Sequence, residues 1–104
     1  MKHFHRTSVH PDAVLKAADE FFPTIGMRPT GSTPRARSWE GTVGMPDDVV
    51  SSLTIKVWME GGHYTFIEAD TTAMGESRLD RNVKKFLVEV HRMADPRFAL
   101  TGSF

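Results

Sequence analysis

The sequence has 104 residues, a length typical of one domain with a single hydrophobic core. Thirteen basic residues balance thirteen acidic ones, and this zero formal charge disfavours a general binder of polyanions. There is no cysteine, which excludes a disulfide framework and a thiol nucleophile. No apolar run approaches the ~20 residues of a membrane span. Because the N-terminus also lacks the apolar core of a secretory signal, we expect a cytoplasmic protein with no membrane partner.

The first part of the chain predicts a strand, a helix and a loop. Residues 2–9 alternate imperfectly between apolar and polar side chains, which indicates a strand. Pro11 suits the first turn of a helix, and Pro23 marks its end. From residue 14 onward, apolar residues recur at three- and four-residue spacing and form one stripe. The stripe consists of Val14, Leu15, Ala18, Phe21 and Phe22, and it continues past Pro23 to Ile25. Residues 26–36 hold two glycines and two prolines among polar residues, so we predict a surface loop there.

The middle of the chain predicts three consecutive strands. Residues 35–43 form the first of them, and residues 44–48 contain glycine, proline and aspartate, which is typical of a turn. Two further strand-like runs then flank Gly61 and Gly62. A two-residue Gly-Gly loop favours a tight hairpin because both residues can adopt positive φ.

The register of this hairpin decides which side chains face the core. With a two-residue loop, Met59 pairs with Tyr64 and Val57 with Phe66. The alternation of a strand then places one set of side chains on the core face: Leu53, Ile55, Val57, Met59, Tyr64 and Phe66, followed by Glu68 and Asp70. Trp58 lies on the opposite face, which is partly apolar.

The last element is a long amphipathic helix that begins after Ser77. Ser77 and Asp80 approximate a capping box, in which side chains three residues apart satisfy free N–H groups at a helix N-terminus. Apolar residues follow at helical spacing: Leu79, Val83, Phe86, Leu87, Val90 and Ala94. Asp95 and Pro96 end the helix, and residues 97–104 form a C-terminal tail.

The predicted order of elements is strand, helix, three strands and helix, which defines an α+β domain. About four antiparallel strands would pack against the long C-terminal helix, because that helix carries the wider apolar stripe. Residues 1–96 would form this single domain.

Three stretches of sequence carry a resemblance to a known superfamily. They are SVHPDAVLKAADEFF, which follows the first strand, GGHYTFIEADT in the hairpin and RLDRNVKKFLVEVHRMAD in the last helix. Over roughly residues 4–94 the chain resembles a short, divergent member of the START/Bet v 1-like (SRPBCC, helix-grip) superfamily. The resemblance implies binding of lipids, hormones or polyketides, or in some members cyclase or hydrolase chemistry. It carries no universal catalytic residue, so none is transferred to this chain.

A cleft between the sheet and the last helix is the first candidate site, and it would bind a small apolar or amphipathic molecule. Its predicted lining is Phe22, Met59, Tyr64, Phe66, Phe86 and Val90. Alternatively, the same side chains only fill the core, which a domain this small requires. Whether the cleft is catalytic stays open. If it is, Glu68 would act as the acid or base, because an apolar surrounding destabilises a carboxylate's charge, and Tyr64 would donate a hydrogen bond.

The histidines suggest a weaker hypothesis. His3 and His5 lie on one face of the first strand, a spacing at which two imidazoles can bind one metal ion. A solvated strand face accounts for the same pattern. We therefore assign no metal ion and no cofactor.

Two surfaces offer alternative functions. Exposed Trp58 beside Ile67 favours a non-enzymatic interaction module whose partner would be a second copy of the chain. RNA binding through the last helix is a minor alternative, because that helix carries five basic residues: Arg78, Arg81, Lys84, Lys85 and Arg92. Zero net charge and the interruption of this basic cluster by Asp80 argue against nucleic acid.

Overall fold

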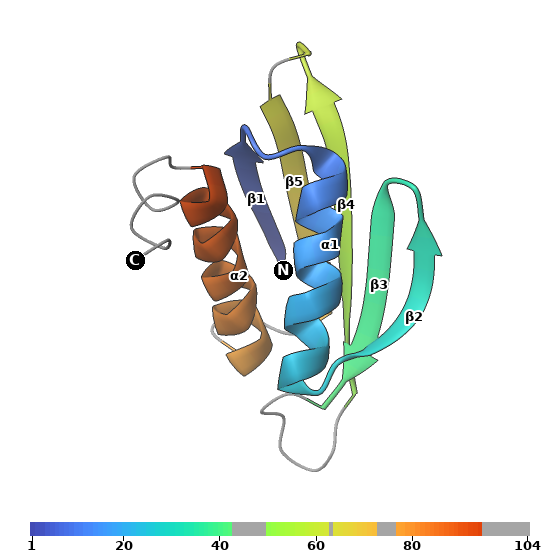
Figure 1. Cartoon of the computed structure of the whole chain (residues 1–104). Coiled ribbons are helices and arrows are strands. Elements are labelled where there is room, and N and C mark those ends of the chain that lie inside the picture. The colour runs from blue at the N-terminus through green and yellow to red at the C-terminus, as the bar shows by residue number, and fades with distance from the viewer. Residues whose placement is uncertain (43–49, 63, 73–76, 95–104) are drawn as a thin grey trace.

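The computed structural model describes residues 1–42, 50–62, 64–72 and 77–94. They form two layers, a five-stranded antiparallel sheet and two helices that cover one of its faces (Figure 1). The strands are β1 (Lys2–Thr7), β2 (Arg28–Thr33), β3 (Ala36–Gly41), β4 (Ser51–Glu60) and β5 (Tyr64–Thr71). The helices are α1 (Pro11–Phe21), a short 3₁₀ helix η1 (Phe22–Ile25) and α2 (Arg78–Ala94). The α+β class and the long C-terminal helix are confirmed, and the sheet has one strand more than the approximate four expected.

The strand order is β1-β5-β4-β3-β2, so the first strand of the chain pairs with the last. Strands β2 to β5 are successive antiparallel neighbours, whereas β1 is added at the β5 edge. Helix α1 packs mainly on β4, and α2 packs on β1 and β5 (Figure 1). The two helices therefore divide one sheet face between them and leave the other face uncovered by any described helix.

The first helix begins and ends as its sequence predicts. The N–H of Asp12 donates to Nδ1 of His10, which caps the helix, and Pro11 occupies the first turn. The chain leaves η1 through Gly26, whose φ of 88° is readily adopted only by glycine.

The predicted loop at residues 26–36 is wrong, because most of it is strand β2. All six residues of β2 are exposed, so the segment has no alternation of buried and exposed side chains that sequence reasoning could detect. Pro29 is tolerated because β2 is an edge strand, and the pairing with β3 is irregular between Pro29 and Gly31. The predicted strand at 35–43 is observed as β3, and the predicted turn at 44–48 lies outside the described residues.

The predicted hairpin register is wrong by one residue. Glu60 pairs with Tyr64, so the connection has three residues, although Gly61 and Gly62 adopt the expected positive φ of 60° and 73°. A shift of one residue turns every side chain of β5 to the opposite face. The core face of β5 therefore carries Thr65, Ile67, Ala69 and Thr71. The outer face carries Tyr64, Phe66, Glu68 and Asp70, which reverses the predicted placement of all four.

The core lies between the sheet and the two helices. Phe22 is at its centre, with ring centroids 5.1 Å from Trp39 and 5.2 Å from Phe86. Trp39 is 1% exposed, which places it on the core face of β3. The predicted stripes of both helices are buried here, apart from the partly exposed Ala94, Phe21 and Ile25. No described helix is long and apolar enough to cross a membrane.

Candidate functional site

A cleft opens where the end of β1 and the start of β5 meet the last turn of α2. Its volume is about 580 Å³, within the ~300–1,000 Å³ typical of small-molecule sites. The described residues that line it are Arg6, Thr7, Ser8, Tyr64, His91 and Ala94. A smaller hollow of about 310 Å³ lies beside the β2–β3 hairpin.

The walls of the cleft combine polar groups with an aromatic ring. Tyr64 is 52% exposed, so its hydroxyl is accessible to a bound molecule. Arg6 is held in place from two sides, because its Nη2 lies 2.9 Å from Oε2 of Glu60 and its guanidinium lies 5.8 Å from the ring centroid of Phe66. This ion pair leaves the cleft without a free cation from Arg6, so the lining is polar without a strong charge.

A pair of imidazoles lies beside the cleft. The ring centroids of His5 on β1 and His91 on α2 are 6.0 Å apart, with one ring edge-on to the other. Nε2 of His5 is buried and has no hydrogen-bond partner among the described residues. Burial, and secondarily the charge of His91, lower the pKa of His5, so this ring is neutral near pH 7. A buried polar atom without a partner is uncommon and marks a place where a ligand group or water can bind.

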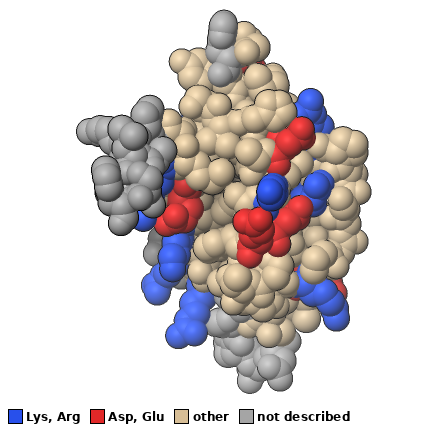
Figure 2. All heavy atoms as spheres, in the orientation of Figure 1, with Lys and Arg blue, Asp and Glu red and all other residues tan. Residues whose placement is uncertain are grey.

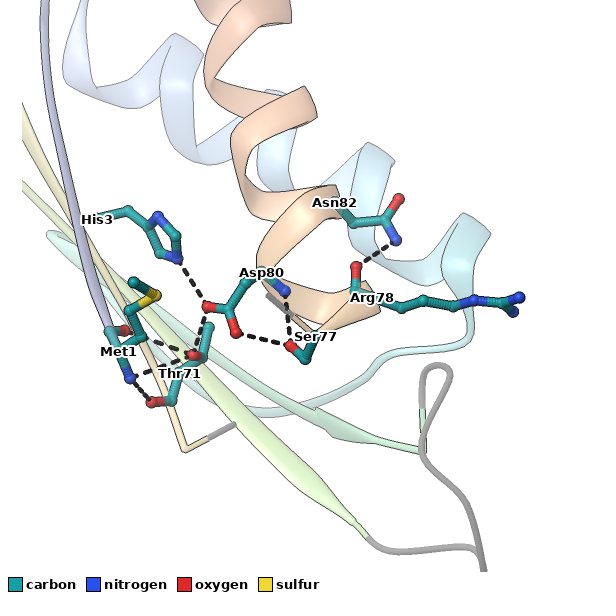
Figure 3. Close-up of polar contacts among 7 residues, drawn as sticks. All are labelled: Met1, His3, Thr71, Ser77, Arg78, Asp80 and Asn82. Carbon is teal, nitrogen blue, oxygen red and sulfur yellow. Dashed lines mark hydrogen bonds and ion pairs between the residues drawn. The ribbon is translucent and has the colours of Figure 1, made fainter. Parts of the chain in front are cut away.

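The opposite end of α2 holds a buried carboxylate, Asp80, which is 0% exposed. Nε2 of His3 lies 2.7 Å from its Oδ1, and the hydroxyl of Thr71 donates to the same oxygen over 2.9 Å (Figure 3). The hydroxyl of Ser77 donates to Oδ2 over 2.6 Å, and in return accepts from the N–H of Asp80. These contacts join the first turn of α2 to β1 and β5.

The hydrogen bonds determine the charge state of Asp80. Burial alone would raise its pKa, but the hydrogen bonds from His3, Ser77 and Thr71 outweigh burial and hold the pKa below the ordinary value. The group is therefore a carboxylate at neutral pH, and His3 must donate its Nε2 proton to it. Since both oxygens are occupied and buried, this Asp80 network (Asp80, His3, Thr71 and Ser77) is a structural contact between elements.

Sequence reasoning found one half of this network. The hydrogen bond from the Asp80 N–H to Ser77 confirms that Ser77 caps the helix. The contact with His3 was missed, although Asp80 stands at helical spacing from Val83 and Leu87 and therefore shares their buried stripe. That position of a carboxylate on an apolar stripe was the available signal.

The common face of His3 and His5 is confirmed, and it points toward α2 rather than into solvent. The two rings contact different partners on α2, namely Asp80 and His91. In the described part of the chain, no group of three or more histidines and carboxylates could hold a metal ion.

The structure does not bring the predicted ligand-binding residues into one cleft. Phe22, Phe86 and Val90 are buried in the core. Phe66 lies on the outer sheet face, and Met59, 43% exposed, lies near the end of β4. Of the predicted set, Tyr64 lines the observed cleft. The binding roles of the others stay predictions.

The predicted acid or base is also displaced. Glu68 lies on the outer face, and its carboxylate is 3.9 Å from the ammonium group of Lys2. An ion pair with a largely exposed lysine satisfies this carboxylate without any role in chemistry. The catalytic assignment of Glu68 and Tyr64 stays a prediction.

The outer sheet face carries what we call the aromatic patch: Phe4, Trp58, Tyr64 and Phe66. The ring centroid of Phe66 is 4.8 Å from that of Trp58 and 5.7 Å from that of Phe4. Trp58 is 39% exposed and Phe4 56% exposed. The exposed Trp58 agrees with the sequence prediction, whereas its neighbour is Phe66 instead of Ile67.

The described part of the helix side mixes both charge signs near its centre (Figure 2). Figure 2 shows acidic side chains beside basic ones across this side, with Lys and Arg also at its lower left. The mixture gives little support to RNA binding, which needs a dense basic surface.

No model of a known protein family matches this chain, and a search of curated protein sequences found no significant match. Two surfaces have the physical features of binding sites: the cleft at the C-terminal end of α2 and the aromatic patch.

Proposed function

We propose that this chain binds a small amphipathic molecule in the cleft at the C-terminal end of α2. The observation that carries the proposal is an open volume of about 580 Å³ lined by His91, whose ring lies 6.0 Å from that of His5, a residue whose buried Nε2 has no hydrogen-bond partner among the described residues. Three hydroxyl groups and an imidazole line the opening, together with the ring of Tyr64. Such a lining suits a molecule with an apolar body and a polar end that can exchange hydrogen bonds with hydroxyl and imidazole groups.

Membership of the SRPBCC superfamily belongs to the same proposal. It is supported by the pairing of the first strand with the last and by the long C-terminal helix against the sheet. In this short chain the space between sheet and helix is occupied by Phe22, Phe86 and Val90, all of them buried. The ligand would therefore bind at the open end of the helix–sheet contact.

Ligand-induced stabilisation tests the proposal. We expect at least one member of a panel of medium-chain fatty acids, fatty alcohols and aromatic alcohols to raise the melting temperature. A ligand at 100 times its Kd contributes about 2.7 kcal/mol by mass action. His91→Ala should reduce this shift, because it removes a wall of the cleft.

Ser32→Ala provides the matched control, because Ser32 lines the smaller hollow at the β2–β3 hairpin. This variant should retain the full ligand-induced shift. The proposal fails if no panel member shifts the melting temperature, or if both variants lose the shift equally.

A second candidate function is a non-enzymatic interaction module, and the aromatic patch is the observation that favours it. Soluble monomers rarely expose a large contiguous apolar surface, and such surfaces commonly mark interaction sites. The two candidate sites adjoin each other: Tyr64 belongs to both the cleft and the patch, and Arg6 of the cleft lies over the ring of Phe66 in the patch.

A further inference from the structure

The geometry of the outer sheet face points to a homodimer in which the aromatic patches of two copies pack against each other. This inference develops the second candidate function and does not depend on a ligand in the cleft. It rests on the exposure of the patch, on the charge balance around it and on the position of the helices.

The patch has the composition of an interface centre. Phe4 and Tyr64 are 56% and 52% exposed, and Trp58 is 39% exposed. Their rings and that of Phe66 occupy adjacent positions on three neighbouring strands, and Arg6 stacks on Phe66. Tryptophan, tyrosine and arginine are the residues that contribute most often to binding energy at protein interfaces. Covering these rings removes apolar surface from water, which favours association.

The charges around the patch favour a partner without a large net charge. The outer face of β1, β5 and β4 carries as many cations as anions: Lys2, Arg6 and Lys56 against Glu60, Glu68 and Asp70. Two of these cations already form ion pairs within the chain, with Glu68 and with Glu60. A nucleic acid or a strongly charged protein would gain little from a balanced face. A second copy brings the same balance, so the two faces can meet without a net repulsion.

The helices leave room for this packing. Both described helices lie on the other side of the sheet, so two copies can stack in the order helices, sheet, sheet, helices (Figure 1). Face-to-face sheets pack ~10 Å apart, a distance that aromatic side chains from both sheets fill. The single-layered sheet of each copy would then be covered on both faces.

The size of the patch sets the expected strength of the dimer. Strands lie ~4.8 Å apart and outward side chains ~7 Å apart along a strand, so the three strands and three cross-strand rows that hold the patch cover on the order of 300 Å². Standard interfaces bury about 800 Å² per partner. The patch is well under half of that area, so we expect a weak, reversible dimer.

Sedimentation velocity across protein concentration tests the inference. We expect the weight-average mass of the wild-type chain to rise from the monomer value toward twice that value between ~1 and ~500 μM. Trp58→Asp places a charge at the centre of the patch and should raise the Kd at least ~10-fold. Val88→Asp is the matched control, because Val88 is 50% exposed on α2, in the other layer of the molecule, and should leave the Kd unchanged.

Two further measurements keep the result interpretable. In Trp58→Asp the remaining tryptophan is Trp39, which is 1% exposed, so a blue-shifted emission reports a folded core. If that variant does not fold, Phe4→Ser decides, because it removes a half-exposed ring and should also weaken the dimer. A wild-type mass that stays monomeric over the whole range, or a Kd that neither patch variant changes, would overturn the inference. His91→Ala should leave the dimer intact, which separates this result from failure of the ligand proposal.

Discussion

The two ends of the contact between β1 and α2 differ in how they treat a buried histidine. His3 and His5 lie two residues apart on the same strand face, and each meets α2. At one end Nε2 of His3 binds the carboxylate of Asp80, whose two oxygens also accept hydrogen bonds from Thr71 and Ser77. At the other end His5 meets the imidazole of His91, and its own Nε2 has no partner among the described residues.

The difference separates a structural contact from a site that can accept a ligand. A buried polar group that is fully hydrogen-bonded stabilises one arrangement and has no capacity left for chemistry. A buried polar group without a partner costs free energy, and a ligand that supplies the missing hydrogen bond recovers it. The polar residues of α2 that face β1 thus decide which histidine is structural.

Of the changes at the two ends, removal of the Asp80 carboxylate should lower the free energy of unfolding the most. Asp80→Ala leaves His3, Thr71 and Ser77 without their common acceptor at the first turn of α2. We expect a loss of about 3 kcal/mol in the free energy of unfolding, measured by urea denaturation. Glu89→Ala on the exposed side of α2 is the control and should change stability by less than about 0.5 kcal/mol. Equal effects from the two variants would show that the buried network adds nothing.

Replacement of each histidine by leucine should give opposite results. His3→Leu leaves the buried carboxylate of Asp80 without one of its three side-chain donors, so we expect a loss of about 2 kcal/mol. His5→Leu removes a buried nitrogen that has no hydrogen-bond partner in the described part of the chain, so stability should stay within about 0.5 kcal/mol or increase. Parallel urea titrations of the two variants measure the difference. If His5→Leu is the more damaging change, the assignment of the two ends is reversed.

Acidification should affect the two ends in separate pH ranges. The pKa of His5 is lowered from 6.5 in the folded chain, so the unfolded chain binds the proton first and stability falls as the pH drops below about 6.5. The pKa of Asp80 is lowered from 3.8, so its contribution is lost only as the pH falls below about 3.8. Unfolding free energies measured from pH 8 to pH 3 should therefore decline in two steps. His5→Leu should remove the first step and keep the second; a first step that persists would assign it to another group.

The smallest expected effect concerns His91. Its charge is the second cause of the lowered pKa of His5, after burial. His91→Ala should move the pKa of His5 upward but leave it below 6.5, because the ring stays buried. The NMR titration of the His5 ring protons measures this change, and an unaltered titration would show that the two rings do not interact. Global stability should change by less than about 0.5 kcal/mol, since His91 lies at the exposed end of the cleft.

The sequence predicts the helices of this fold well because their apolar stripes are long and periodic. Residues with a clear physical role mark three of their boundaries: α1 begins at Pro11, its 3₁₀ continuation η1 ends at Gly26, and α2 begins after Ser77. Strand β2 could not be predicted, because an edge strand with six exposed residues buries no side chain and has no alternation to detect.

The predicted register of the β4–β5 hairpin is wrong by one residue, and this affects the predicted site most. Tyr64 and Phe66 are bulkier than Thr65 and Ile67, and sequence reasoning placed the aromatic rings inside. The structure buries the β-branched pair and leaves the rings outside, because the connection between β4 and β5 has one residue more than Gly61 and Gly62 alone provide. A shift of one residue moved Glu68 from the core to the surface and with it the predicted acid or base.

The cleft was beyond sequence reasoning for a related reason. Its lining joins the end of β1 to the last turn of α2, residues about as far apart in the sequence as the described chain allows. These residues come together only because β1 pairs with β5. The sequence pattern around Arg6 or His91 does not indicate that pairing.

That pairing has a further consequence, for the order in which the molecule assembles. Strands β2 to β5 are neighbours in sequence and in space, so hairpins can form them one after another with short loops. Strand β1 is made first, yet its partner β5 follows more than fifty residues later, and α2, which covers β1, comes after that. Until β5 has been synthesised, β1 lacks its partner strand in the sheet, so Phe4, His3 and His5 are exposed to water. Completion of the sheet edge should be a late step and the slowest contact to form, because long-range contacts carry the largest entropic barrier.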